Sequence, residues 1–188
     1  MRGAVLLLGP LLAKTGHIEI TQEIGGCSLG IRELDPHLEV LKNLGAKITM
    51  NGPLKIDAEK GLTGAFLWQD YMSVTTTENF IMAAVYAKGE STMVNAASEP
   101  HVQDLCNLLI AMGAEIEGGG TSKIAVKGGK KLHGVDFTIS SDHHEITTLL
   151  ALGAMTGGEM IVDSAEQGCI PLIRKSMFIV NILSWMVK

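Results

Sequence analysis

Apolar residues recur along the chain in two patterns, one with the spacing of a helix and one with the spacing of a strand. Helical spacing covers residues 36–44 and 100–112, and each stretch ends at a glycine, Gly45 or Gly113. Alternation of apolar and polar residues follows at once, in AKITM and AEIEG. These patterns predict helices that end at a left-handed glycine and lead almost directly into strands.

The same order of elements repeats at a fixed distance. Gly45 and Gly113 are 68 residues apart, and the same distance separates a second pair of similar stretches. A short strand follows each turn, at LKIDA and KIAVK, and a further helix is expected over residues 77–87. The repeat predicts an α/β fold built from a few large units. A third unit is expected after the helix-like residues 171–180, with Asn181 at the cap position.

Composition indicates a compact globular protein. The chain has 188 residues, of which 46% are hydrophobic and 19% charged, and its formal net charge is −5. That charge argues against a nucleic-acid partner, although a small basic pocket could still hold one anionic metabolite. The start of the chain imitates a signal peptide, but Gly9 and Pro10 interrupt its apolar run, and the apolar tail is too short to span a bilayer. We expect a cytoplasmic protein with no membrane partner.

One cysteine stands in a glycine-rich stretch, GGCSLGIRELDPH, at residues 25–37. Glycines let the backbone come close to a ligand, and Arg32 nearby would stabilise a thiolate at Cys27. The pattern favours a reactive thiol over a small buried hydrophobe, the usual fate of cysteine. Cys106 lies in an apolar helix and Cys169 near the end of the sequence, so both are expected to be structural or incidental. An odd number of cysteines without a CxxC pair predicts a reducing compartment.

Other polar residues fit both a structural and a functional interpretation. Arg32 could be a solvated cation or a planar clamp on a phosphate. Asp35 and Pro36 fit the N-cap and the first position of a helix. Ser73 and the threonines at 75–77 predict a hydroxyl-rich helix start, which is compatible with a cradle for a nucleotide.

A run of possible metal ligands occurs at SSDHHEIT, residues 140–147. Consecutive residues on a helix point about 100° apart, so these side chains cannot converge on one ion. Asp142 and Glu145 are instead expected to form a cap pair at a helix start. We expect no metal site.

Four stretches carry a resemblance to a known family through their order and spacing along the chain: LLGPLLAKTG, GGCSLGIRELDPHLEVLKNLGA, MSVTTTENFIMAAVYAKG and NAASEPHVQDLCNLLIAMGA. Together they resemble the UDP-N-acetylglucosamine 1-carboxyvinyltransferase family of enolpyruvyl transferases, from about Arg2 to about Asp163. The resemblance implies repeated βαβαββ units of the enolpyruvyl transferase fold, an inside-out α/β barrel, here truncated at both ends. Residues 1–140 would form most of one domain, without its N-terminal part, and residues 141–188 the start of a second.

The resemblance also implies a reaction. The 3-hydroxyl of UDP-N-acetylglucosamine attacks C2 of phosphoenolpyruvate, C3 is protonated and phosphate leaves. This transfer is the first committed step of peptidoglycan synthesis, and hence of cell wall biogenesis and cell shape. No metal or organic cofactor is implied. The isolated chain is expected to be inactive, because the family's N-terminal lysine, second-domain aspartate and late arginine have no counterparts in it.

Roles for individual residues follow from the resemblance as well. Cys27 matches the family's general acid toward C3, which is the cysteine that fosfomycin alkylates. Arg32 matches an arginine near the phosphates of phosphoenolpyruvate and the sugar nucleotide, and Arg2 matches another basic residue of the cleft. The segments that match contacts to the uridine nucleotide consist of Arg32, Glu33, Leu34, Asp35 and Pro36, and of Tyr71, Met72, Ser73 and Val74. Better-known members carry lysine at the position of Tyr71 and often proline at the position of Glu33.

Two alternative functions remain open. An enzyme like 5-enolpyruvylshikimate-3-phosphate synthase would share the fold but not the cysteine loop. A non-catalytic remnant that binds a sugar nucleotide would need only the repeats.

Overall fold

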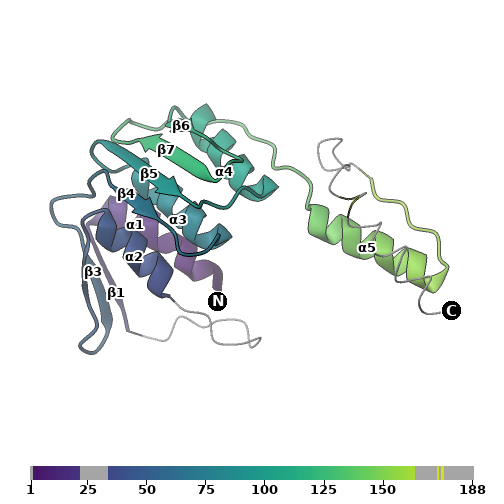
Figure 1. The fold of residues 1–188 in the computed structure, drawn as a ribbon, viewed down its shortest axis with the longest axis horizontal. Helices are drawn as coiled ribbons and strands as arrows, with labels where there is room; N and C mark the ends of the chain where they lie inside the picture. Colours follow the sequence, from purple (N-terminus) through teal and green to yellow (C-terminus); the bar gives the residue numbers. More distant parts are fainter. Residues whose placement is uncertain (1, 22–33, 164–172, 174, 176–188) are drawn as a thin grey trace. The chain divides into compact units, whose positions relative to one another are not determined.

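The structure is a computed structural model that describes residues 2–21, 34–163, 173 and 175. The chain divides into two compact units, Met1–Phe137 and Thr138–Lys188. Most of the helices and all of the strands assigned to the described residues lie in the first unit (Figure 1). The assignment of residues 1–140 and 141–188 to two domains stays a prediction.

The first repeat of helices and strands occupies residues 2–57. A 3-10 helix, η1 (Arg2–Leu7), continues into α1 (Leu8–Thr15), and β1 (His17–Ile20), α2 (Asp35–Asn43), β2 (Lys47–Thr49) and β3 (Leu54–Asp57) follow. The three strands form one sheet in the order β1-β3-β2, and β3 is antiparallel to both of its neighbours.

The second repeat occupies residues 66–127 and carries one more strand. It consists of β4 (Phe66–Trp68), α3 (Val74–Ala84), β5 (Glu90–Val94), α4 (Pro100–Ala111), β6 (Glu115–Glu117) and β7 (Lys123–Lys127). The sheet order is β4-β5-β7-β6, with β4 parallel to β5 and the other pairs antiparallel. From α3 to β7 the elements repeat the order seen from α1 to β3. The predicted repeat is therefore confirmed, and the second copy is a complete βαβαββ unit.

Both repeats make the same turn between their second helix and the next strand. Gly45 and Gly113 have φ angles of 95° and 102°, which confirms the predicted left-handed glycines. In each turn the amide of the following alanine donates to a carbonyl five residues earlier, at 3.0 and 2.9 Å. This bond is the one that closes a Schellman motif. The predicted cap at Asn181 lies outside the described residues.

Two predicted helix starts are wrong. α2 begins at Asp35 with Leu34 at the N-cap position, and no side chain caps it. Asp35 is thus the first helical residue, where its charge still interacts favourably with the helix dipole. The helix expected over residues 77–87 is α3, which spans Val74–Ala84 because the Ser73 hydroxyl accepts the N–H of Thr76 and so caps the helix earlier.

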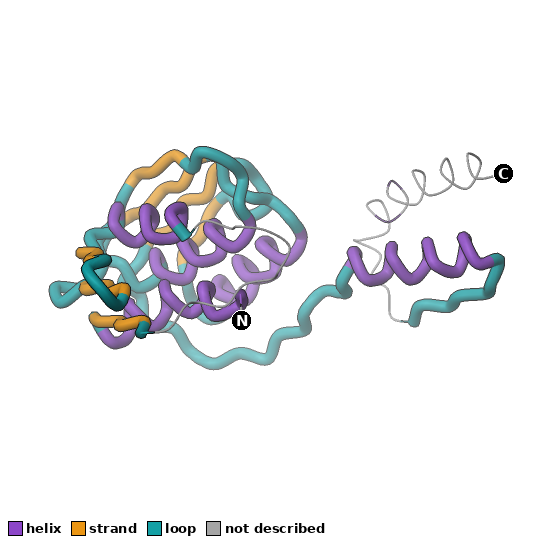
Figure 2. Tube along the Cα trace, turned by 90° about the horizontal axis from the view of Figure 1, so that it is seen from below, coloured by secondary structure: helices purple, strands orange, loops and turns teal. Residues whose placement is uncertain are grey.

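The helices of the two repeats pack against one another around one hydrophobic core. α3 contacts α1, α2 and α4, and its Phe80 and Ile81 are fully buried. The sheets cover this helical core with one face only. In β7, for example, Ile124 and Val126 are buried while the lysines at both ends are exposed. Helices that share one core, with the sheets on one side of them, agree with the expected α/β fold of enolpyruvyl transferases (Figure 2).

The buried side-chain amide of Asn79, on α3, forms hydrogen bonds with the backbone of the first helix. The Asn79 side chain is fully buried, its Oδ1 accepts the N–H of Gly9 at 2.7 Å, and its Nδ2 donates to the carbonyl of Val5 at 3.1 Å. In an uninterrupted α-helix the Gly9 N–H would donate to the Val5 carbonyl itself. Asn79 therefore replaces one helical hydrogen bond at the point where η1 becomes α1.

Gly9 is required by this close approach. A Cβ on residue 9 would lie 2.5 Å from Asn79 Oδ1 and 2.7 Å from the Asn79 backbone oxygen. The carboxamide also reaches α2, since its Nδ2 lies 3.2 Å from Nδ1 of the buried His37. Asn79 thus connects α1, α2 and α3 through one side chain.

The second unit contains α5 (His143–Thr156) among its described residues. The Asp142 carboxylate accepts the N–H groups of His144 and Glu145, so the predicted capping role of Asp142 is confirmed. The helix ends at Gly157, whose φ is 69°. A small cluster of Ile146 and Ile173 packs with neighbouring apolar residues. None of the described helices combines the length and apolar character needed to cross a membrane.

Replacing Asn79 by alanine should destabilise the first unit strongly. Asn79→Ala leaves the Gly9 N–H and the Val5 carbonyl without their partner and opens a cavity between three helices. We expect the free energy of unfolding to fall by about 2–4 kcal/mol in denaturant titrations. Asn107→Ala, at an exposed position on α4, is the control and should change it by no more than about 0.5 kcal/mol. Equal effects of the two variants would contradict the structural role of the carboxamide.

Candidate active-site wall

The predicted site residues divide into those that the structure describes and those that it does not. Cys27, Arg32 and Glu33 lie outside the described residues, and their roles stay predictions. Arg2 is the first residue of η1. The other predicted residues lie at two helix starts: Leu34, Asp35 and Pro36 at the start of α2, and Tyr71, Met72 and Ser73 between β4 and α3, with Val74 as the first residue of α3.

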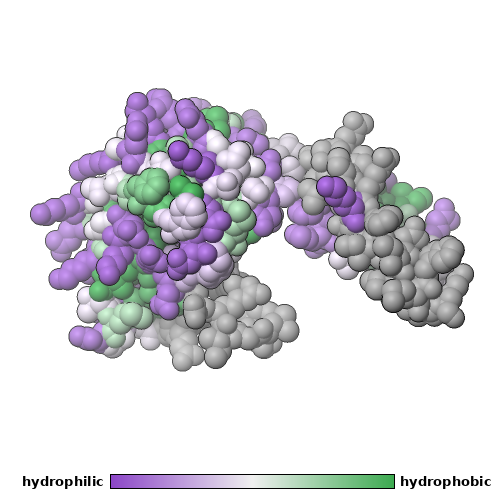
Figure 3. All heavy atoms as spheres, in the orientation of Figure 1, coloured by the Kyte–Doolittle hydropathy of each residue, from purple (hydrophilic) through white to green (hydrophobic). Residues whose placement is uncertain are grey.

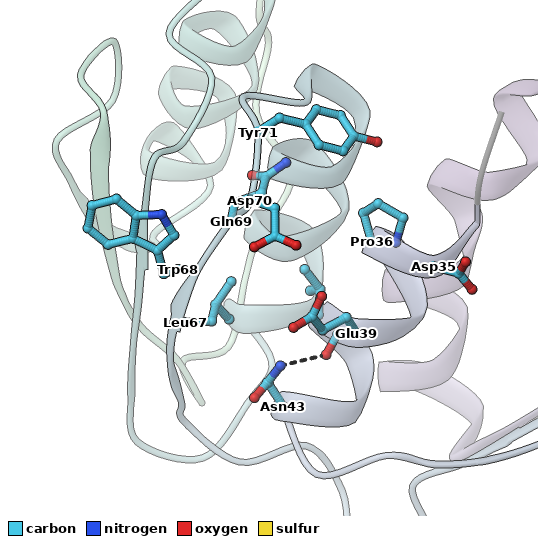
Figure 4. A pocket seen from close by; sticks show the side chains of 10 residues that line it. Asp35, Pro36, Glu39, Asn43, Leu67, Trp68, Gln69, Asp70 and Tyr71 are labelled. Carbon is cyan, nitrogen blue, oxygen red and sulfur yellow. Dashed lines mark hydrogen bonds between the residues drawn. The ribbon is translucent and has the colours of Figure 1, made fainter.

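A pocket of about 320 Å³ brings these two segments together. Asp35 and Pro36 line it from α2, and Tyr71 lines it from the turn after β4 (Figure 4). The sequence did not identify the other residues that line it: Glu39, Val40, Asn43, Leu67, Trp68, Gln69 and Asp70. Leu34, Met72, Ser73 and Val74 are not among the lining residues.

The pocket lining is acidic. It contains the carboxylates of Asp35, Glu39 and Asp70, and no lysine or arginine occurs among the described residues that line it. Glu39 and Asp70 point into the space between α2 and the turn, and Tyr71 lies across from Pro36 (Figure 4). Ionised carboxylates only accept hydrogen bonds, so this lining suits a ligand that offers N–H and O–H donors.

β4 ends at the pocket and exposes two aromatic side chains. Phe66 is 70% exposed and Trp68 is 65% exposed. Trp68 points away from α2 in Figure 4, and Figure 3 shows apolar side chains among hydrophilic ones on the face that carries β4 and β5. The wall of the pocket on this side is formed by Leu67 and Trp68 of β4 together with the turn that follows the strand.

A buried polar chain links the two walls. His37 follows Pro36 in α2, and its Nε2 lies 3.4 Å from the hydroxyl of Thr75 near the start of α3. The other ring nitrogen, Nδ1, lies 3.2 Å from Nδ2 of Asn79, which can only donate. Nδ1 therefore accepts, and in the neutral ring the proton lies on Nε2.

The connection from the first strand after each repeat's first helix to the next helix differs in length between the two repeats. β1 leads to α2 through residues 21–34, whereas β5 leads to α4 through residues 95–99. The longer connection contains the predicted Cys27 loop. Insertions in repeat proteins gather on one face, which is often the binding face.

The described cysteine, Cys106, is not a candidate nucleophile. It is 1% exposed on α4, and burial raises the pKa of its thiol to about 11. The predicted structural role of Cys106 is confirmed, and Cys169 lies outside the described residues. Within the part of the chain that the structure describes, no three His, Cys, Asp or Glu side chains lie close enough to hold a metal ion.

Two glutamates lie where α3 and α4 begin. Burial raises the pKa of Glu78, and the nearby charge of Glu99 raises it further, while His101 opposes the shift. One carboxylate oxygen of Glu99 is buried and makes no hydrogen bond with the described residues. β4 and β5 are parallel, so both helices start at the carboxyl edge of this strand pair, the edge at which open α/β sheets bind ligands.

Comparisons with known proteins identify the relatives of the chain. The model of the EPSP synthase (3-phosphoshikimate 1-carboxyvinyltransferase) family matches residues 1–182. UDP-N-acetylglucosamine 1-carboxyvinyltransferase of Borrelia garinii subsp. bavariensis is 45% identical over 175 residues, which are 93% of this chain and 40% of that protein. The protein of the same name from Acidobacterium capsulatum is 47% identical over 163 residues, 86% of this chain and 37% of that protein. This chain thus spans well under half the length of both relatives.

Solved structures with a similar fold are more distant in sequence. The enolpyruvyl transferase NikO from Streptomyces tendae gives a TM-score of 0.65 at 21% identity, over 81% of this chain and 36% of that one. EPSP synthase from Acinetobacter baumannii gives 0.63 at 23% identity, over 82% of this chain and 35% of that one. These similarities support the enolpyruvyl transferase fold.

The raised pKa of Glu78 predicts a pH-dependent stability. The unfolded carboxyl has a pKa of 4.5, so above that pH the native state retains a proton that the unfolded state has lost. The contribution of Glu78 to the free energy of unfolding should therefore fall with rising pH until the native pKa is passed. Glutamine does not ionise, so Glu78→Gln does not lose stability in this way. The free energy of unfolding of Glu78→Gln relative to the parent should therefore rise above pH 4.5 and then level off.

Denaturant titrations between about pH 4 and pH 8 measure this difference. Glu59→Gln, at an exposed position, is the control and should show no such trend. A stability difference for Glu78→Gln that stays constant with pH would contradict the buried environment of the carboxyl.

Proposed function

Because the chain belongs to the EPSP synthase family of enolpyruvyl transferases, we propose that it forms the nucleotide-binding wall of a UDP-N-acetylglucosamine 1-carboxyvinyltransferase. The chain spans 40% of the length of the Borrelia relative, and the complete reaction is therefore part of the proposal. Its substrates would be the small molecules phosphoenolpyruvate and UDP-N-acetylglucosamine.

The pocket between α2 and the turn after β4 carries this proposal. The resemblance assigns two segments, far apart in the sequence, to the uridine nucleotide. Asp35 and Pro36 from one segment and Tyr71 from the other line the same pocket. Residues that contact one ligand must lie close together. The resemblance is one of sequence, so the proximity of these residues in the structure supports the proposal independently.

The chemistry of the pocket supports a nucleoside as the bound group. The uracil ring offers an imide N–H and the ribose offers two hydroxyls, all of which can donate to Asp35, Glu39 or Asp70. A phosphate would be repelled by the same carboxylates. The diphosphate of the nucleotide would then lie outside this pocket, near the N-terminus of α3, where Ser73 and Val74 begin the helix.

The carboxylates of the pocket argue against the alternative of an enzyme like 5-enolpyruvylshikimate-3-phosphate synthase. Shikimate 3-phosphate carries both a phosphate and a carboxylate, so an acidic pocket is a poor environment for it. The 45–47% identity to relatives named for UDP-N-acetylglucosamine supports the same choice.

The proposed reaction needs a proton donor and cations beside the reacting atoms. A bond forms between the sugar 3-oxygen and C2 of phosphoenolpyruvate, the 3-hydroxyl gives up its proton, and C3 takes up a proton. Loss of a proton from C3 together with cleavage of the bond from C2 to the phosphate oxygen restores the double bond and releases phosphate. We assign Cys27 as the general acid toward C3, Arg32 as the cation near the phosphates and Arg2 as another basic residue of the cleft.

The cellular setting belongs to the same proposal. The reaction would be the first committed step of peptidoglycan synthesis, in the cytoplasm. Cys27 would be the residue that fosfomycin alkylates.

Binding by the purified chain tests the proposal. Isothermal titration calorimetry should detect binding of UDP-N-acetylglucosamine and of UDP, and no binding of shikimate 3-phosphate. Asp35→Ala removes one acceptor from the pocket and should weaken nucleotide binding about tenfold. Asp136→Ala, at an exposed position that does not line the pocket, should bind as the parent does. Preference for shikimate 3-phosphate, or equal affinities of the two variants, would refute the proposal.

A further inference from the structure

The turn that forms one wall of the pocket is held by side chains that do not line it. This turn, residues 69–73, connects β4 to α3. Thr77 is fully buried on α3, and its hydroxyl lies 2.8 Å from the Ser73 carbonyl and 3.3 Å from Gln69 Oε1. A hydroxyl has one proton, so it donates to the closer Ser73 carbonyl. Thr77 therefore fixes the end of the turn.

The connection from β5 to α4 holds the other end of the same turn. The Asn95 side chain donates from Nδ2 to the Gln69 carbonyl at 2.8 Å. The N–H of Ala97 donates to the Thr77 hydroxyl at 3.0 Å, so the two anchors belong to one network. Asn95 has a φ of 63°, a left-handed conformation that asparagine tolerates better than most residues do.

We propose that Thr77 and Asn95 are positioning residues that hold the turn at 69–73 in place as the nucleotide-binding wall. The inference rests on the proposed function for the identity of the ligand, while the anchoring itself is a property of the ligand-free chain. Thr77 and Asn95 act through the turn and do not line the pocket themselves.

The exposed residues of the turn depend on these anchors. Asp70 and Tyr71 line the pocket, and neither side chain makes a hydrogen bond with the described residues. Gln69, at the start of the turn, is 5% exposed, and its side chain forms a hydrogen bond within the turn, as those of Asp70 and Tyr71 do not among the described residues. The positions of the two pocket residues are therefore set through Gln69 and Ser73.

Four substitutions distinguish a loss of the anchoring hydrogen bonds from a general loss of stability. Thr77→Val keeps the shape of the side chain and removes its hydroxyl, whereas Thr77→Ser keeps the hydroxyl. Asn95→Gly tolerates the positive φ and removes the amide donor. Val126→Ala opens a cavity in the core under β7 without touching the turn, and it serves as a matched control for lost stability.

Amide hydrogen exchange of the ligand-free chain measures the anchoring directly. We expect exchange of the Gln69 amide, which donates to the Val94 carbonyl at 3.0 Å, to become about tenfold faster in Thr77→Val and in Asn95→Gly. Thr77→Ser should restore the slow exchange, and Val126→Ala should leave this amide unchanged even though it lowers the melting temperature. Unchanged exchange in both Thr77→Val and Asn95→Gly overturns the inference.

Binding of UDP-N-acetylglucosamine measures the consequence for the ligand. The dissociation constant should rise about tenfold in Thr77→Val and in Asn95→Gly, well below their melting temperatures, and return toward the parent value in Thr77→Ser. A rise of the same size in Val126→Ala, or faster exchange without any rise, would overturn the positioning role. If the parent chain does not bind the nucleotide, the proposed function fails, and hydrogen exchange still decides whether the turn is anchored.

Discussion

One buried carboxamide fixes the spacing of the helices on which the pocket depends. Asn79 takes the place of a backbone hydrogen bond in the first helix, where its partners are an N–H that can only donate and a carbonyl that can only accept. Its orientation is therefore determined, and its Nδ2 must face His37. His37 contacts Thr75 in turn, so a continuous buried chain of polar groups runs from α1 through α2 to the start of α3. One wall of the pocket lies on α2, and the other is formed by the end of β4 and the turn that leads into α3.

The repeated architecture explains why a site forms between the two copies. α2 belongs to the first repeat and the turn after β4 to the second, so neither repeat contains the pocket alone. A buried amide or hydroxyl without a partner costs free energy, and the helices can pack closely only when such groups are satisfied. The polar networks around Asn79 and Thr77 meet this requirement and at the same time give the pocket walls their positions.

Much of this arrangement could be predicted from the sequence, because local patterns determine it. The repeat, the left-handed turns at Gly45 and Gly113 and the cap at Asp142 each depend on a few neighbouring residues. The partners of Asn79 could not be predicted, because they lie about seventy residues away and polar side chains inside helices give no local signal. Glu39 and Asp70 were missed for a similar reason, since exposed acidic residues are common and only the fold brings these two to one pocket.

Nuclear magnetic resonance tests the central claim most directly, because it reports where on the chain the nucleotide binds. The claim is that α2 and the turn after β4 form one nucleotide site. Titration of the isotope-labelled chain with UDP-N-acetylglucosamine should shift the backbone amide signals of residues 35, 37–43 and 68–73 together, with a single affinity. Shifts confined to one of these segments, or centred on the exposed face of β6 and β7, would contradict it.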